Sequence, residues 1–89
     1  MVKMAEKENK REYLKEIRKR RKKGEINKRE ENELLQQIEK LQDKVEKEVL
    51  ICRYIKMMEW IDVCDEIGYS WAQTHRIHRK AIEHLMLQS

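Results

Sequence analysis

The segment from residue 71 to residue 80 is rich in side chains that form directional hydrogen bonds or carry positive charge. On a helical wheel of ~100° per residue, these side chains gather opposite a mostly apolar stripe. The stripe consists of Thr74, Ile77, Ala81 and Leu85, and the opposite face of Ala72, His75, Arg76, Arg79 and Glu83, flanked by Trp71, Gln73 and Lys80. Arg forms paired hydrogen bonds with guanine and Gln with adenine, and Ala or Trp packs on a thymine methyl group. This composition suits base recognition, with Arg79 and Lys80 better placed for phosphate, although any solvated helix face can carry Arg, Lys and His.

Other chemistry is less well supported by the residues. His75, His78 and His84, together with Cys64, suggest a zinc site, but close Cys pairs are missing and His75 and His78 point roughly 60° apart on one helix. The chain has no phosphate-binding loop, nucleophile elbow or paired carboxylates within a predicted cleft. We therefore expect no catalytic residue, no metal and no cofactor, and a protein that is not an enzyme.

Two short helices around a turn are predicted to position the face between residues 71 and 80. One apolar stripe, Trp60, Val63, Cys64 and Ile67, precedes Gly68 at the spacing of a buried helical side. Gly68 suits the left-handed backbone that often ends a helix. Ser70 can then cap the next helix with its hydroxyl group. This order of elements predicts a helix-turn-helix, whose second helix begins at Ser70 and whose predicted DNA contacts include Ser70 itself.

Residues 43 to 85, DKVEKEVLICRYIKMMEWIDVCDEIGYSWAQTHRIHRKAIEHL, resemble region 4 of bacterial sigma factors, and more closely the small sigma-region-4-like proteins of phages and prophages. The most specific pieces are Glu48-Val49-Leu50, Arg53-Tyr54-Ile55, Trp60, Asp65-Glu66-Ile67-Gly68-Tyr69-Ser70, Arg76-Ile77-His78, Ala81 and Leu85. The resemblance implies a recognition helix in the major groove. Trp71, Ala72, His75 and Arg76 would then face bases, whereas Arg79 and Lys80 would meet the DNA backbone.

Composition supports a small, almost entirely helical protein. The 89 residues include no Pro and two Gly, and 43% of them are charged. The longest apolar run is Val49-Leu50-Ile51, which is too short to span a membrane, and no signal-peptide core is visible at the N-terminus. We therefore predict an all-α, cytoplasmic protein. Cys52 and Cys64 are expected to be reduced thiols on buried helix faces.

The positive charge is concentrated in the N-terminal half. Residues 1 to 48 contain 16 Lys and Arg against 12 Asp and Glu, whereas residues 49 to 89 contain five of each, which accounts for the net charge of +4. Six consecutive cations form the sharpest feature: Arg18, Lys19, Arg20, Arg21, Lys22 and Lys23. Such a run cannot occupy one helix face. It is predicted to contact a nucleic-acid backbone or other polyanion, or else to be solvated without a dedicated ligand.

The N-terminal half is predicted to form two helices with few apolar residues. The first has Tyr13, Leu14 and Ile17 on a narrow edge and ends at Gly24. The second, capped by Asn27, carries a short coiled-coil seam and is predicted to continue to Met57, over roughly 45 Å. The seam consists of Leu34, Ile38, Leu41 and Val45. It either covers the first helix in an intramolecular hairpin or pairs with another chain, and the scarcity of apolar residues favours a homodimer.

Three segments result: a basic helix in 1–24, a coiled-coil-like helix in 25–47 that continues into the next segment, and a sigma-region-4-like helix-turn-helix in 48–89. The expected function is sequence-specific binding of double-stranded DNA by a phage or prophage transcription regulator, which also contacts RNA polymerase if it activates. The near-neutral C-terminal half and the Trp71-Ala72 pair favour an alternative, a phage inhibitor that binds a host nucleic-acid enzyme such as a defence nuclease or RNA polymerase. A structural adaptor assembled through the seam is a third hypothesis.

Overall fold

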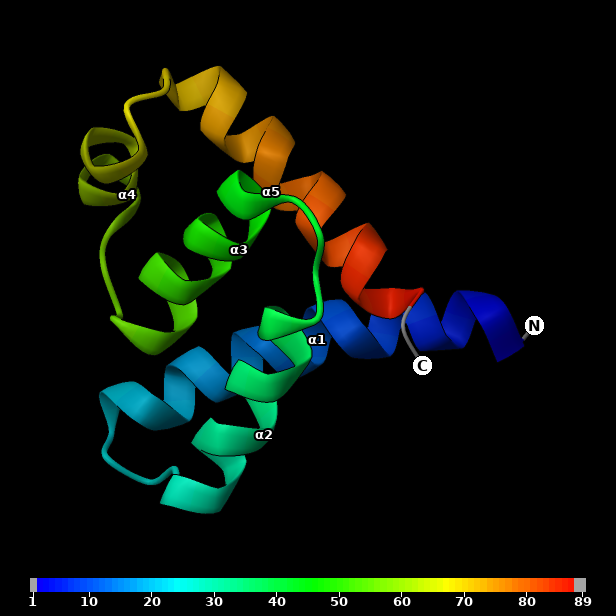
Figure 1. Ribbon diagram of the computed structural model, residues 1–89. Coiled ribbons are helices and arrows are strands. Elements are labelled where there is room, and N and C mark those ends of the chain that lie inside the picture. Colours follow the sequence, from blue (N-terminus) through cyan, green and yellow to red (C-terminus); the bar gives the residue numbers. More distant parts are fainter. Residues whose placement is uncertain (1, 88–89) are drawn as a thin grey trace.

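The protein is all-α, as the composition predicts. A computed structural model describes residues 2–87, with side chains from residue 11 onward, and these residues contain helices and turns but no strand. The elements in chain order are α1 (Val2–Lys22), α2 (Lys28–Glu39), α3 (Lys44–Leu50), the π-helical turn η1 (Ile51–Ile55), α4 (Trp60–Ile67) and α5 (Trp71–Met86). Figure 1 shows α3 at the centre, with α4 and α5 on one side and α1 and α2 on the other.

Local capping residues set several of the helix ends. The Asn27 side chain accepts a hydrogen bond from the Glu30 amide at 2.9 Å and so begins α2. Beyond the end of α1, Gly24 adopts the left-handed conformation with φ of 72°, and the Glu25 amide donates to the Arg20 carbonyl at 2.8 Å. Both predicted caps are therefore confirmed.

The predicted continuous helix from Asn27 to Met57 is wrong, because the chain leaves the helix between residues 40 and 43. α2 ends at Glu39, and α3 begins after Asp43, whose carboxylate accepts hydrogen bonds from the amides of Val45 and Glu46. The break has a physical reason: a 45 Å rod would leave much of its apolar side uncovered, whereas two shorter helices can turn their apolar sides into one core.

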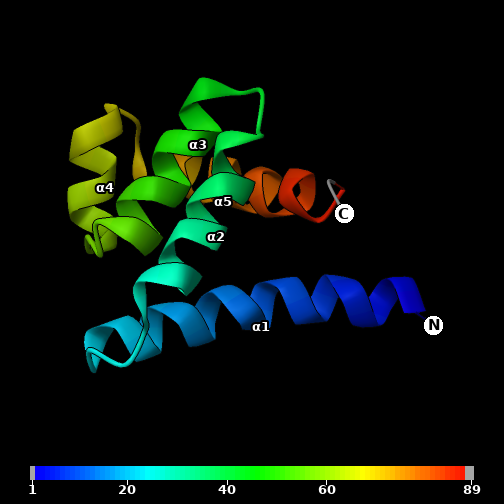
Figure 2. The same cartoon turned by 60° about the horizontal axis from the view of Figure 1, so that its bottom comes forward.

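The seam residues pack within one chain. Leu34 and Ile38 of α2 are fully buried in the same cluster as Leu14 and Ile17 of α1, and Leu41 in the break joins them. Val45 is only half-buried. The chain thus adopts the intramolecular alternative, in which α2 leaves α1 at an angle after the turn at residues 23–27 (Figure 2). The dimer was expected because the first helix has few apolar residues, yet Leu14 and Ile17 of that helix are buried together with Leu34 and Ile38 within one chain.

One main core connects both ends of the chain. Besides the residues of α1 and α2, it contains Leu50 of α3 and Tyr54 of η1. The C-terminal half of α5 contributes Ala81, Ile82 and Leu85. A second, smaller cluster lies between α4 and the α3–η1 segment and consists of Val49, Cys52 and Val63. Trp60, Ile67 and Ile77 pack around it. α5 is consequently supported along its length by two separate clusters.

Candidate nucleic-acid interface

α4 and α5 are joined by the three-residue turn 68–70, and the two helices run in different directions (Figures 1 and 2). Gly68 has a left-handed backbone with φ of 76°, and its amide and that of Tyr69 both donate to the Cys64 carbonyl, at 2.9 and 3.3 Å. The Ser70 hydroxyl then accepts a hydrogen bond from the Gln73 amide at 3.3 Å. The predicted roles of Gly68 and Ser70 in ending one helix and beginning the next are confirmed.

The outer side of α5 is open to solvent. Thr74, Ala81 and Leu85 of the predicted stripe are buried on the inner side, whereas Ile77 of that stripe is only half-buried; Ile82, which the stripe did not include, is buried as well. Seven of the eight predicted contact residues are exposed: Ser70, Trp71, Ala72, Gln73, Arg76, Arg79 and Lys80. Trp71 stands out, since 57% of its surface is accessible despite its size. The eighth residue, His75, is half-buried.

His75 is held in an aromatic cluster that sequence reasoning missed. Its ring lies 4.3 Å from that of Trp60 and 4.6 Å from that of Trp71, measured between centroids. The Arg53 guanidinium covers the Trp60 ring at 4.3 Å. Burial, followed by the charges of Arg53 and Arg79, lowers the pKa of His75. The imidazole therefore packs against Trp71 and lies at the edge of the exposed side of α5.

A second pair of side chains, the buried Tyr54 of η1 and the half-buried His78 of α5, connects these two helices. The Tyr54 hydroxyl and His78 Nε2 are 2.9 Å apart, and the His78 ring also meets Trp60 edge-on at 4.8 Å. Burial is the main cause that lowers the pKa of His78 to about 4 and raises the pKa of Tyr54. At neutral pH the phenol is thus protonated and the imidazole neutral, and the imidazole tautomer decides which of the two groups donates the hydrogen bond.

The three arginines of the basic run 18–23 have partners within the fold, whereas its three lysines are exposed. Arg18 is 8% exposed, donates to the Arg53 carbonyl at 2.8 Å and lies 3.4 Å from the Glu59 carboxylate. Arg21 donates to the Ile55 carbonyl at 2.6 Å. These carbonyls belong to the last turn of η1, where a helix leaves backbone carbonyls without an amide donor from its own next turn. Two guanidinium groups of α1 therefore cap the C-terminal end of η1.

The rest of the run divides between paired and free cations. Arg20 makes two hydrogen bonds with the Glu30 carboxylate, at 2.7 and 2.9 Å, and Arg21 also pairs with Glu31 at 3.0 Å. Lys22 lies 3.9 Å from Glu59. Lys19 and Lys23 are exposed. Although the six cations are neighbours in sequence, they do not form one surface patch, because the helix distributes them around α1. The three arginines have their partners in later parts of the chain, beginning with α2.

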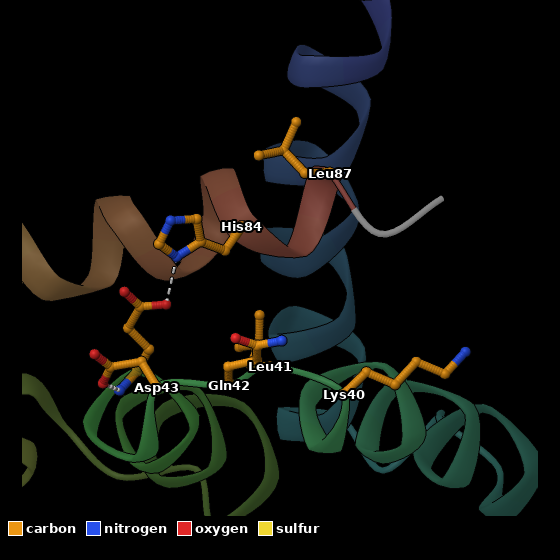
Figure 3. A pocket seen from close by; sticks show the side chains of 7 residues that line it. Lys40, Leu41, Gln42, Asp43, His84 and Leu87 are labelled. Carbon is orange, nitrogen blue, oxygen red and sulfur yellow. Dashed lines mark hydrogen bonds and ion pairs between the residues drawn. The ribbon is translucent and has the colours of Figure 1, made fainter.

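A hollow also lies between the break at residues 40–43 and the C-terminal end of α5 (Figure 3). It has a volume of about 550 Å³. Its most buried polar group, the Glu46 carboxylate, is hydrogen-bonded to His84 Nδ1 at 2.7 Å. Figure 3 shows His84 and Leu87 on one side and Lys40 to Asp43 on the other. The carboxylate is thus satisfied within the protein, and the hollow presents no group that awaits a ligand.

The cysteines and histidines are separated by the fold. Cys52 is buried and Cys64 half-buried, and both are free thiols. The zinc alternative used Cys64 with three histidines, but His84 pairs with Glu46 while His75 and His78 lie in the aromatic cluster. Over the described residues, no three or more potential metal ligands lie together. Within the same part of the chain, no helix is both long and apolar enough to span a membrane.

The fold defines an all-α protein in which two N-terminal helices brace a pair of helices joined by a tight glycine turn. The chain belongs to the family described as protein of unknown function (DUF1492), whose model matches residues 5–86. This match covers both the N-terminal hairpin and the α4–α5 pair, so the family includes them as one unit. Comparisons with curated proteins and with solved structures returned no match.

Proposed function

We propose that this protein is a sequence-specific DNA-binding regulator of transcription, of the phage or prophage type that its resemblance to sigma region 4 implies. In this proposal α4 and α5 form the helix-turn-helix, and α5 is the recognition helix in the major groove. The observation that carries the proposal is the exposed outer side of the N-terminal half of α5. This half follows the turn at Gly68 and the cap at Ser70, and its polar side chains point away from both cores.

The distribution of burial along α5 supports this orientation. Fully buried side chains concentrate near its C-terminal end, at Ala81, Ile82 and Leu85, whereas Thr74 alone is buried in the first half. The part from Trp71 to Arg76 therefore projects from the body of the protein. Arg76 would form paired hydrogen bonds with a guanine and Gln73 with an adenine, and Trp71 or Ala72 would contact a thymine methyl group. Arg79 and Lys80, one turn further, would hold phosphates.

Selection of bound sequences from a random pool of duplex DNA tests the proposal. We expect an enriched motif, and we expect Arg76→Ala to weaken binding to that motif roughly 10-fold or more while relaxing the preference at one base pair. Arg29→Ala is a matched control, since Arg29 is exposed on α2 and pairs only with the nearby Glu33. It should leave the base preference unchanged. A pool without enrichment would overturn the proposal.

A protein partner is the second candidate, in the form of an inhibitor that binds a host nucleic-acid enzyme. One observation favours it: large apolar side chains gather on α4 and the turn, where Ile61, Tyr69 and Trp71 are 65%, 40% and 57% exposed. Trp and Tyr are frequent anchors of protein interfaces. Replacing Arg76 and Arg79 together with Ala separates the two candidates, because a DNA regulator would lose its site affinity and an inhibitor anchored by apolar residues would retain its activity.

A further inference from the structure

A small pocket lies where α1 meets α5, beside the exposed face of the recognition helix. It has a volume of about 140 Å³, room for several water molecules at about 30 Å³ each. Two elements distant in sequence supply its charged rim: Arg11 and Lys15 from α1, and Arg79 from α5. Tyr54, His78 and Ile82 complete its lining.

The side chains at the rim of this pocket carry an excess of positive charge. Among the described residues, neither Arg11 nor Arg79 has an ion pair, and Lys15 has only a long contact of 3.9 Å with the exposed Glu12. This sets the three cations apart from Arg18, Arg20 and Arg21, which the fold neutralises. Three cations that converge on one pocket without a close carboxylate partner among the described residues repel one another until an anion is bound.

The floor of the pocket offers no competing negative charge. The Tyr54 hydroxyl is already committed to His78 Nε2 at 2.9 Å, and both groups are neutral at pH 7. The charge of Arg11 reaches both rings, since it contributes to lowering the pKa of His78 and acts against burial at Tyr54. No carboxylate lines this pocket. An anion could therefore approach Arg11, Lys15 and Arg79 without meeting a like charge at short range.

We propose that this pocket binds a phosphate group of the DNA backbone, held jointly by Arg11 and Lys15 of α1 and Arg79 of α5. The source of the phosphate rests on the function proposed above, whereas the phosphate chemistry follows from the pocket itself. Arg79 lies one helical turn from Arg76, so the pocket adjoins the base-reading side chains. The first helix thus extends the DNA interface through residues 11 and 15, outside the basic run.

The decisive experiment compares full-length variants that lose two positive charges at different places. Arg11→Ala combined with Lys15→Ala removes the α1 side of the rim. Lys28→Ala combined with Arg29→Ala is the control, because both residues are exposed in the first turn of α2, which lies away from α5 (Figures 1 and 2). Affinity for duplex DNA carrying the selected site is measured by fluorescence anisotropy across a series of salt concentrations.

The slope of log affinity against log salt is expected to fall by about one for the rim variant, since the pocket holds one phosphate and each neutralised phosphate contributes ~0.9, and affinity near physiological salt should drop roughly 10-fold. The base preference should stay the same. If the rim and control variants behave alike on DNA that the wild-type protein binds specifically, this inference is wrong and the proposed function stands.

A titration with inorganic phosphate separates the pocket from the DNA proposal. Bound phosphate should raise the pKa of His78 in the wild-type protein, which the ring proton signals report by NMR, and the rim variant should not respond. A response in a protein that binds no duplex DNA would assign the pocket to a free phosphate compound and overturn the backbone contact. No response and no change in the salt slope would reject the phosphate site altogether.

Discussion

Thr74 lies on the buried side of α5, fully inaccessible to water, and its hydroxyl oxygen has no hydrogen-bond partner in the structure. A buried hydroxyl without a partner costs about 1–3 kcal/mol relative to one that is paired or absent. Val has nearly the same shape and no hydroxyl group. We therefore expect Thr74→Val to raise the free energy of unfolding by about 1 kcal/mol, measured by urea denaturation.

A second substitution at the same position, which keeps the hydroxyl group and removes the methyl group, provides the control. Thr74→Ser keeps the unpaired hydroxyl and removes a buried methyl group, so it should lower the free energy of unfolding by about 1 kcal/mol. If Val destabilised the protein as much as Ser does, the hydroxyl would have to be satisfied in solution, and the argument from its burial would be wrong.

His78 makes stability depend on pH. Its pKa in the folded protein is about 4, below the ordinary value of 6.5, so between these values the unfolded chain binds more protons than the folded one. The free energy of unfolding should therefore fall as pH decreases from about 6.5 to about 4, by up to about 3 kcal/mol from this residue. Urea denaturation at several pH values measures it.

His78→Gln isolates that contribution, because the amide does not titrate in this range. The variant should lose most of the pH dependence between 6.5 and 4, and His75, whose pKa is also lowered, should account for part of what remains. Equal pH dependence in the variant and the wild-type protein would show that the titration of His78 does not cause it.

At the scale of helices, α1 contributes hydrogen bonds as well as apolar surface. Arg18 satisfies the Arg53 carbonyl at the end of η1 and approaches Glu59, which stands before α4 without capping it through its own side chain. Arg18→Met preserves the apolar stem and removes these bonds. The free energy of unfolding should fall by about 2–3 kcal/mol, since a charged donor to a buried carbonyl is lost.

Lys19→Met is the matched control for that variant. Lys19 is adjacent in sequence, carries the same charge and is exposed, so its replacement should change stability by about 0.5 kcal/mol at most. Thermal and urea denaturation of both proteins measure the difference. Equal effects would mean that the loss comes from helix charge rather than from the contacts of Arg18 with η1 and α4.

The helix ends differ in how far sequence could predict them. Asn27, Ser70, Gly24 and Gly68 act on their own neighbours within a few residues, so the local pattern sufficed. The break before Asp43 was hidden by apolar spacing that continued across it. A signal was nevertheless present, because Asp43 followed three residues later by an acidic side chain has the form of a helix start.

The candidate site was predictable only in part, for the same reason. The exposed face of α5 follows from helical periodicity, and the structure leaves all of it but His75 open. The partners of Arg18 lie 35 and 41 residues away, and one of them is a backbone carbonyl that no residue type reveals. Likewise, the pocket between α1 and α5 depends on how two distant helices cross.

At the scale of the whole molecule, the three segments 1–24, 25–47 and 48–89 contribute to one core. Removal of residues 1–24 should therefore expose the buried sides of α2 and α5 and eliminate the caps on η1. We expect the truncated chain to lose cooperative thermal unfolding, monitored by circular dichroism. A truncated chain that unfolds as sharply as the intact protein would show that residues 25–89 form an independent domain.

The main core also constrains the order of events during synthesis. Leu14 and Ile17, made early, share their packing with Ala81, Ile82 and Leu85, made late. The nascent hairpin therefore leaves the ribosome with one apolar side unoccupied until α5 follows it. Factors that delay translation between residues 24 and 71 would prolong that interval, so the yield of folded protein in cells should depend on how quickly the ribosome crosses this middle stretch.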